Sequence, residues 1–355
     1  MDCKYPAVDR DPLVRLPPVL GHFEHEPEVG AGEGVRYLLG IDGGATKTLA
    51  AVLDVERGAV YLGQGGPSNQ DAVGVQAAGR ALFEAADQAL AGAGVEDGQL
   101  DAAVLAIAGT DTDAVVRYVR EERSSEWIVV GDVVGAWATA TAARPGVGVI
   151  SGTGSNVFGV GRDGRAWRAG GWGHVLGDEG SGYWLGLQSI KAALRDREAS
   201  GPATALSDAA VAFFGFPSVE ALATAVYSKP LGKSEIAAFA IETAGFAERG
   251  DAVACELYEA GARELAEQIA AVVRQTGLQG RFPVGLIGSA YKAGSVFVEP
   301  LTRAIHAFAP EAAVAVVELA PVGGSLLLAA RACGAEGVLA GIDLAALIDA
   351  VRVAG

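Results

Sequence analysis

The feature of this sequence that most constrains its fold is an internal repeat of two strands joined by a glycine-rich turn. In the first half, an apolar strand at 37–42 runs into consecutive glycines and a second strand at 48–54. In the second half, a strand at 147–152 runs into another glycine-rich turn and a second strand at 156–161. The repeat indicates two domains of like topology, which also suits a chain of 355 residues.

Strands and helices alternate after each repeat. The first half is expected to contain three strands, a long helix at 71–91 and two strand–helix pairs, and it ends at the break Arg144-Pro145-Gly146. This alternation predicts an α/β fold with largely parallel sheets that helices cover on both faces. After the three strands of the second half, the expected elements are helices at 180–197, 203–214, 219–227, 234–247 and 252–276, a strand at 283–287, a helix at 295–308, a strand at 313–319 and a helix at 324–333.

Glycine content and net charge narrow the classes of partner. The chain has 50 glycines among 355 residues, about twice the ordinary ~7% share, and they follow no collagen period. We therefore expect them in tight turns and in sites lined by backbone. The formal net charge is −16, and no run of Lys and Arg offers a basic face, which argues against nucleic acid and against an anionic membrane surface.

The cysteine spacing and the lack of long apolar runs indicate the cellular compartment of the protein. Cys3, Cys255 and Cys333 are too far apart in sequence for a zinc or iron–sulfur site held within one chain. Residues 1–35 form an arm that lacks the uninterrupted apolar run of a signal peptide, and no stretch reaches the ~20 apolar residues of a spanning helix. We expect a cytoplasmic protein.

The first turn is a candidate phosphate and metal site. Asp42 ends a buried strand, where ligands of α/β sheets usually bind, and Gly43, Gly44 and the hydroxyls of Thr46 and Thr48 follow it. A carboxylate in this place can hold hydrated Mg²⁺ against a triphosphate, while backbone N–H groups approach the phosphate oxygens. An Asp-Gly pair alone would equally be a hairpin turn. The matching turn at 151–156 favours a cleft that binds phosphates.

Asp132 and the segment 169–183 carry the other candidate groups. Asp132 lies between a strand and a helix, where it either caps the helix or accepts a proton from an attacking hydroxyl. In AGGWGHVLGDEGSGY, Asp178 and Trp172 are the carboxylate and the aromatic face that sugar sites use. Asp178 could instead complement the N-terminus of the next helix, and a structural role is expected for His174.

Glycines late in the chain are candidates for an adenine site. They stand between a strand and a helix at 287–290 and at 321–325. Backbone without a side chain can lie against a flat ring, and close packing of a helix on a strand would explain these glycines nearly as well.

Four motifs together resemble a known family. DGGATK at 42–47, Gly131-Asp132, ISGTGSN at 150–156 and GGWGHVLGDEGS at 170–181 occur in the order found in N-acetylglucosamine kinases. These belong to the BadF/BadG/BcrA/BcrD-type ATPase family of the sugar kinase/Hsp70/actin superfamily, and the resemblance extends over residues 36–334. Ala45 stands where the vertebrate-type enzymes carry a third glycine.

The resemblance implies a two-lobed actin-like ATPase fold made of duplicated ribonuclease H-like domains, with ATP, Mg²⁺ and sugar in the interdomain cleft. It implies a smaller first lobe at 36–144 that 337–355 completes, and a larger second lobe at 145–336 with a helical insertion. It also implies Asp132 as the base and Asp42 as the metal-binding residue, through water. The implied sugar ligands are Asn69, Asp132, Thr153, Gly171, Trp172 and Asp178, and the implied nucleotide ligands are Gly43, Gly44, Thr46, Lys47, Gly152, Thr153, Gly154, Gly288, Ser289, Gly323 and Gly324.

The expected activity is therefore transfer of the γ-phosphoryl group of ATP to the 6-hydroxyl of N-acetylglucosamine, with glucosamine as the alternative acceptor. Two other classes are an ATPase that activates another enzyme, whose cysteine pair this chain does not reproduce, and a non-catalytic sugar or nucleotide sensor. The resemblance favours a homodimer. The lobes are expected to close around the sugar about a hinge at 143–146.

Overall fold

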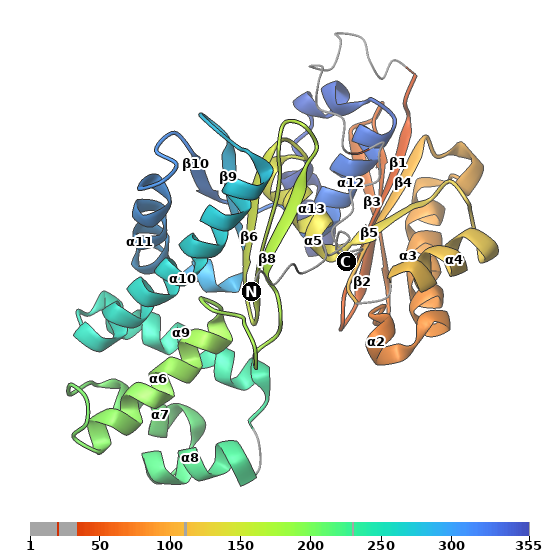
Figure 1. Ribbon diagram of the computed structural model, residues 1–355. Helices are drawn as coiled ribbons and strands as arrows, with labels where there is room; N and C mark the ends of the chain where they lie inside the picture. The colour runs from red at the N-terminus through yellow and green to blue at the C-terminus, as the bar shows by residue number, and fades with distance from the viewer. Residues whose placement is uncertain (1–19, 21–33, 110–111, 229–230, 355) are drawn as a thin grey trace, which may run out of the picture. The chain divides into compact units, whose positions relative to one another are not determined.

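The computed structural model describes residues 20, 34–109, 112–228 and 231–354 (Figure 1). Chain contacts divide the protein into two compact units. The first unit comprises Met1–Gly146, Val160–Trp167 and Val317–Gly355, and the second comprises Val147–Gly159 and Arg168–Val316. The arm expected at 1–35 lies outside the described residues except at 20 and 34–35.

The first unit is built on a five-stranded sheet with the order β3-β2-β1-β4-β5. Its first three strands form an antiparallel meander, in which Asp42 of β1 lies opposite Leu49 of β2. The next two strands run parallel to β1, so that Asp42 also lies opposite Ala106 of β4. The strands are β1 (Tyr37–Gly43), β2 (Thr48–Asp54), β3 (Ala59–Gly65), β4 (Ala102–Ile107) and β5 (Ile128–Gly131).

The second unit repeats this strand order. Its sheet reads β10-β9-β6-β7-β8, so β6, β7 and β8 take the places of β1, β2 and β3, while β9 and β10 take those of β4 and β5. Both β9 and β10 belong to parallel pairs, as β4 and β5 do. The strands are β6 (Gly146–Ser151), β7 (Ser155–Val160), β8 (Ala166–Gly170), β9 (Pro283–Ile287) and β10 (Ala313–Val316).

The expectation of largely parallel sheets is wrong for the first sheet. Two of its four strand pairs are antiparallel, because the short turns between β1, β2 and β3 can only return the chain in the opposite direction. Crossover helices produce the parallel pairs, and these involve only β1, β4 and β5.

Helices cover both faces of the first sheet (Figure 1). On one face, α3 packs closely on β3, because Gly63 and Gly65 leave no side chain between the strand and the helix backbone. On the other face, α12 packs on β1, and the buried Ser325 hydroxyl donates to Ile41 O at 2.7 Å. The helices of this unit are α2 (Gln70–Val73), α3 (Val75–Ala93), η2 (Asp97–Gln99), α4 (Thr112–Glu122), α5 (Asp132–Thr141), α12 (Pro321–Ala332), η4 (Glu336–Gly341) and α13 (Leu344–Ala354).

Two boundaries in the first unit differ from those expected. The helix expected at 71–91 is split into α2 and α3 at Gly74, whose φ of 80° no helix accommodates. The chain returns to the first unit at Val317 rather than at 337, because α12 packs on β1 and α5. The closing helix of this unit is α13, shorter than the expected segment.

The second unit has a core of its own beside its sheet. Buried side chains of α10 and α11, such as Leu265 and Phe297, form one cluster with those of β6 and β9. A second cluster, which includes Ile190, Leu222 and Phe239, holds α6 to α9 together as the helical insertion. The helices are α6 (Gly182–Arg197), α7 (Leu206–Phe214), α8 (Val219–Ser228), α9 (Lys233–Glu248), α10 (Ala252–Thr276), η3 (Ser289–Ala293) and α11 (Ser295–His306).

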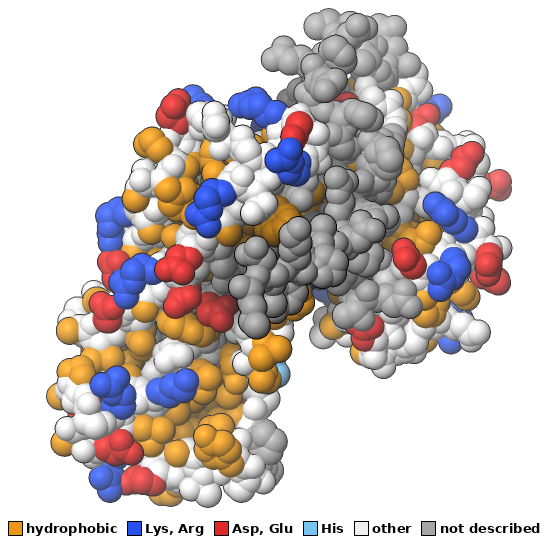
Figure 2. All heavy atoms as spheres, viewed as in Figure 1, with side chains coloured by type: hydrophobic (Ala, Val, Ile, Leu, Met, Phe, Trp, Pro, Cys, Tyr) orange, Lys and Arg blue, Asp and Glu red, His pale blue; other side chains and the backbone are white. Residues whose placement is uncertain are grey.

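By itself, no helix among the described residues has the length and apolar composition needed to cross a membrane. Only α7 and α8 taken together, bent by 51° at their junction, meet that criterion. On the face drawn in Figure 2, acidic and basic side chains of the described residues are interspersed.

Candidate active site

The turn between β1 and β2 is a braced backbone loop. Gly44 N–H donates to Lys47 O at 3.0 Å, which closes the turn, and Gly44 O accepts from Ser68 N–H at 3.0 Å. A Cβ on Gly43 would come within 2.5 Å of Ser68 Oγ, so only glycine allows this approach. The Thr48 hydroxyl is buried, donates to Gly66 O at 2.8 Å and lies 2.8 Å from the Ser68 hydroxyl, so it braces the loop instead of facing a ligand.

The tip of this turn is open to solvent. Thr46 and Lys47, two of the predicted nucleotide ligands, are exposed, while Gly44 is partly buried. An ammonium and a hydroxyl at the end of a rigid turn can approach a phosphate without moving the backbone that carries them.

Two carboxylates lie at the carboxyl edge of the first sheet. Asp42 is the penultimate residue of β1, and Asp132 directly follows β5 as the first residue of α5. Burial raises the pKa of the Asp42 carboxyl from 3.8 to about 6, with a further contribution from the negative charge of Asp132 and an opposing one from Lys47. The structure therefore brings together the predicted base and the predicted metal-binding residue.

This carboxylate pair fits a hydrated magnesium ion. Mg²⁺ takes oxygen ligands, keeps several waters and is usually held by one or two carboxylates together with substrate phosphates. A divalent cation would also relieve the repulsion that raises the Asp42 pKa. Within the part of the chain that the structure describes, no three His, Cys, Asp or Glu side chains gather at one point. Water and phosphate oxygens would therefore supply most of the ligands.

Asn69 is the N-cap of α2. Its Oδ1 accepts from Asp71 N–H at 2.9 Å, so its side-chain NH₂ group is the part that can donate to a sugar hydroxyl. The next residue, Gln70, was not singled out from the sequence as a site residue. Its amide is buried against Gly109, and neither polar atom has a hydrogen-bond partner among the described residues.

The glycine-rich turn of the second unit, residues 151–155, is tied to the segment that precedes α6. The Ser151 hydroxyl donates to Gly180 O and the Ser155 hydroxyl to Glu179 O, both at 2.8 Å. Within the turn, Gly152 N–H donates to Gly154 O at 2.9 Å. Thr153 is exposed at the tip, as a residue that contacts both nucleotide and sugar would need to be.

The predicted phosphate and adenosine residues of the second unit are neighbours. Gly288 has a φ of 124°, and a Cβ there would come within 2.2 Å of Ser151 O. Ser289 begins η3, and its Oγ lies 3.8 Å from where a Cβ on Gly152 would stand. The carboxyl ends of β6 and β9 therefore place Gly152, Gly288 and Ser289 side by side.

Asp178 is buried and takes a left-handed backbone conformation with a φ of 63°. Its Oδ1 accepts from Ser155 N–H at 3.2 Å, and its Oδ2 accepts from Lys233 Nζ at 2.7 Å. The helix-capping role considered for it belongs instead to Ser181, whose hydroxyl accepts from Trp184 N–H at 3.1 Å. Lys233 was not singled out from the sequence, because 55 residues separate it from Asp178.

The loop before Asp178 carries exposed apolar side chains. The indole of Trp172 is 66% exposed, and the Arg168 guanidinium lies 5.0 Å above its ring. His174 is exposed and packs edge-on against Tyr183, with ring centroids 5.1 Å apart. An exposed indole is available to stack on a sugar face.

Glycines at the start of this loop lie against two side-chain amides. Gly171 packs on Asn156 and Gly170 on Gln268, and both glycines have a positive φ. The amide oxygens of Asn156 and Gln268 are buried and accept no hydrogen bond from any described residue. Neither residue was singled out from the sequence, although Asn156 ends the ISGTGSN motif.

Gly323 and Gly324 lie in α12 of the first unit, whereas Gly288 and Ser289 lie in the second. A Cβ on Gly324 would come within 2.3 Å of Gly135 O in α5. Close packing of two helices therefore accounts for Gly324, and an adenosine-binding role for this pair stays a prediction.

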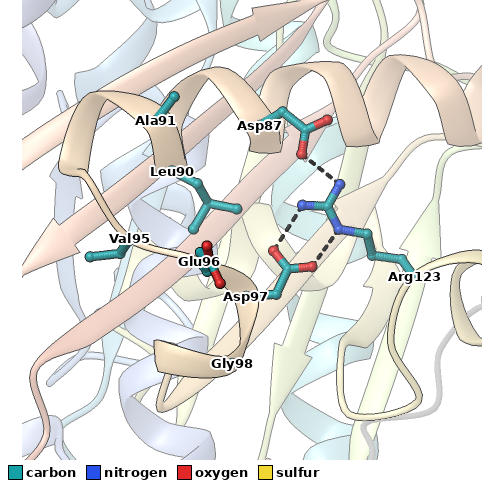
Figure 3. A pocket seen from close by; sticks show the side chains of 8 residues that line it. All are labelled: Asp87, Leu90, Ala91, Val95, Glu96, Asp97, Gly98 and Arg123. Carbon is teal, nitrogen blue, oxygen red and sulfur yellow. Dashed lines mark hydrogen bonds and ion pairs between the residues drawn. The ribbon is translucent and has the colours of Figure 1, made fainter.

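A surface pocket of about 470 Å³ lies beside α3 and η2 of the first unit, and none of the predicted site residues lines it (Figure 3). Arg123 bridges Asp87 at 2.6 Å and Asp97 at 2.5 Å there, and its guanidinium also lies 4.9 Å above the Trp127 ring. Figure 3 shows these ion pairs, in which Arg123 pairs with both carboxylates. Arg123 therefore links α3, η2 and the end of α4, which is a structural role.

Comparison with known proteins identifies the family. Residues 39–329 match the BadF/BadG/BcrA/BcrD ATPase family, and the chain belongs to this family. It is 32% identical over 252 residues to an N-acetylmuramic acid/N-acetylglucosamine kinase of Clostridium acetobutylicum, spanning 70% of this chain and 82% of that protein. It is 26% identical over 314 residues to an N-acetyl-D-glucosamine kinase of Dictyostelium discoideum, spanning 83% and 98% of the two chains.

A crystal structure supports the fold. A protein of Chromobacterium violaceum assigned as an N-acetylglucosamine kinase superposes with a TM-score of 0.63 at 24% identity, over 83% of this chain and 99% of the other. The duplicated α/β fold predicted from the sequence, and the actin-like fold that the resemblance implied, are thereby confirmed.

Proposed function

We propose that this member of the BadF/BadG/BcrA/BcrD ATPase family is an ATP-dependent sugar kinase that phosphorylates the 6-hydroxyl of N-acetylglucosamine. The observation that carries the proposal is the pair of carboxylates, Asp42 and Asp132, at the edge of the first sheet beside a braced glycine turn. The names of the two relatives support the choice of N-acetylglucosamine.

Asp132 is the general base in this proposal. It accepts the proton of the sugar hydroxyl as the hydroxyl oxygen forms a bond to the γ-phosphorus and the bond from that phosphorus to ADP breaks. Asp42 holds Mg²⁺ through water, and the ion when bound neutralises charge on the phosphates. Backbone N–H groups at 43–46 and 152–154 and the Lys47 ammonium bind phosphate oxygens.

The remaining assignments concern the sugar and the adenosine. Asp178 accepts from sugar hydroxyls, Trp172 stacks on the sugar face, and Asn69, Thr153 and Gly171 complete the set. Gly288 and Ser289, next to Gly152 in the structure, bind the adenosine end, for which Gly323 and Gly324 are also proposed.

Replacing Asp132 tests the mechanism. We expect Asp132→Asn to lower kcat by roughly 10²- to 10⁴-fold, the usual contribution of a general base, while ATP still binds. The matched control is Asp113→Asn, which removes an exposed carboxylate from the first turn of α4 in the same unit. Near-normal turnover of Asp132→Asn, or an equal loss in the control, contradicts the assignment.

A coupled assay of ADP release tests the activity and the acceptor. The panel is N-acetylglucosamine, glucosamine, N-acetylmuramic acid and glucose, compared by kcat/KM. We expect N-acetylglucosamine to be preferred, with glucosamine the alternative. ADP release that no sugar stimulates would favour an activator-type ATPase, and no release at all would favour a sensor.

A further inference from the structure

Asp178 forms an ion pair with Lys233, a residue to which the proposed function assigns no role. The Asp178 carboxylate is only 4% exposed, and Lys233 is the cation that meets it, at 2.7 Å. Gly154 allows the turn to lie flat on the carboxylate, since a Cβ there would stand 3.0 Å from Asp178 Oδ1. The turn therefore holds Oδ1 of the carboxylate, and Lys233 holds Oδ2.

Lys233 occupies a place that helix stability alone would not select. It is the first residue of α9, and a cation at a helix N-terminus opposes the helix dipole. The cap itself is made by other groups, because Gly232 N–H donates to Glu235 Oε2 at 2.6 Å. The ion pair with Asp178 is therefore the contact that accounts for a lysine at this position.

The backbone that carries Lys233 is held firmly. Gly186 of α6 lies against Ile236 O of α9, where a Cβ would come within 2.0 Å, and only glycine permits this approach. Further along the same two helices, the buried hydroxyls of Ser189 and Thr243 are 2.8 Å apart. This packing fixes α9 on α6, whose own N-terminus follows the Asp178 loop directly.

We propose that Lys233 is a positioning residue for the sugar, acting through Asp178. This inference rests on the proposed function, because it takes Asp178 to be a ligand of the sugar hydroxyls. The ammonium occupies one lone-pair direction of Oδ2 and orients the carboxylate so that its remaining lone pairs face the sugar. The helical insertion thereby contributes to sugar affinity through one side chain.

Removal of Lys233 should affect the sugar and spare the nucleotide. A buried carboxylate that loses its cation is destabilised where it stands and turns toward other donors. We therefore expect Lys233→Met to raise the KM for N-acetylglucosamine by about tenfold or more, with kcat at saturating sugar and the KM for ATP within about threefold of the wild type. Lys233→Arg restores the charge and should bring the sugar KM back toward the wild-type value.

The control removes a lysine of the same unit from an exposed place. Lys191 lies on α6 and is exposed, so Lys191→Met should leave both KM values unchanged. Thermal unfolding of each variant shows that it is folded, and Lys233→Gln replaces Lys233→Met if the latter does not fold.

A double-variant cycle separates positioning through Asp178 from a direct or merely structural role. In an Asp178→Asn background, adding Lys233→Met should cause little further rise in the sugar KM, because the group that Lys233 positions has already changed. A full additional rise overturns the proposal, as does an unchanged sugar KM in Lys233→Met, an equal rise in the KM for ATP, or an arginine variant no better than methionine. Wild-type protein inactive on every aminohexose would instead refute the proposed function.

Discussion

The protonation of the Asp42 carboxyl depends on its position in the fold. Its pKa is raised from 3.8 to about 6 by burial and by Asp132, so its ionised form is disfavoured in the folded state. Above pH 6 the ionised Asp42 carboxylate lowers the stability of the folded protein. Below pH 4 the carboxyl is protonated in both the folded and the unfolded state, so it has no such effect. The destabilisation caused by Asp42 in the wild type therefore disappears as the pH falls from 7 to 4.

Replacing Asp42 by asparagine should consequently stabilise the protein at neutral pH. We expect Asp42→Asn to raise the free energy of unfolding at pH 7 by at most about 3 kcal/mol, and the difference from wild type should shrink toward pH 4. Urea unfolding of both proteins across this pH range measures it. A difference that does not change with pH would contradict the assigned cause.

Magnesium provides a second measurement on the same residue. If Asp42 holds the ion, Mg²⁺ should raise the Tm of the wild type more than that of Asp42→Asn, because binding to the folded state stabilises it by mass action. Equal shifts in the two proteins would place the ion elsewhere.

At the scale of elements, the close approach of β6 and β9 depends on Gly288. A Cβ at this residue would stand 2.2 Å from Ser151 O, and its φ of 124° is one that side-chain-bearing residues rarely adopt. We expect Gly288→Ala to displace the 151–155 turn, to destabilise the protein by roughly 2 kcal/mol or more, and to raise the KM for ATP. Thermal unfolding and initial rates measure these effects.

Gly294 provides the matched control for this prediction. It lies at the other end of η3, also has a positive φ, and has open space where a Cβ would stand. Gly294→Ala should therefore leave the KM for ATP unchanged and cost only backbone strain, about 1–3 kcal/mol, because its φ of 61° and ψ of −139° are rarely adopted by residues with a side chain. Indistinguishable behaviour of the two alanine variants would mean that the contact with Ser151 is not what matters.

Element types and most boundaries could be predicted, because they follow from local pattern. The two glycine turns and the strands around them were expected where they occur, and α10 was expected at its observed bounds. The break at Gly74 and the strand directions are set by backbone conformation and pairing, which hydrophobic spacing does not encode. In the candidate site, Asp42 and Asp132 could be predicted because they lie at the ends of strands. Lys233 could not, because it reaches Asp178 from a helix 55 residues away in the sequence.

At the scale of the whole molecule, duplication is the organising fact. Each unit has its own five-stranded sheet of the same order and its own buried cluster, with side chains such as Leu82 and Leu105 in the first and Val149 and Leu286 in the second. The proposed function assigns residues of both units to one reaction. The homodimer and the closing motion about 143–146 stay predictions, which sedimentation and small-angle scattering measure.

Ligand-dependent unfolding tests whether both units take part. Because each unit has a separate core, we expect differential scanning calorimetry of the free protein to show two transitions or one broad transition. A non-hydrolysable ATP analogue with N-acetylglucosamine should move the whole profile upward, since a ligand at about 100 times its Kd adds about 2.7 kcal/mol, or roughly 5–11 °C for units of this size. If the ligands contact residues of only one unit, only part of the profile will move. That result would contradict the assignment of Asn69 and Asp132 in the first unit and Asp178 in the second to the same sugar.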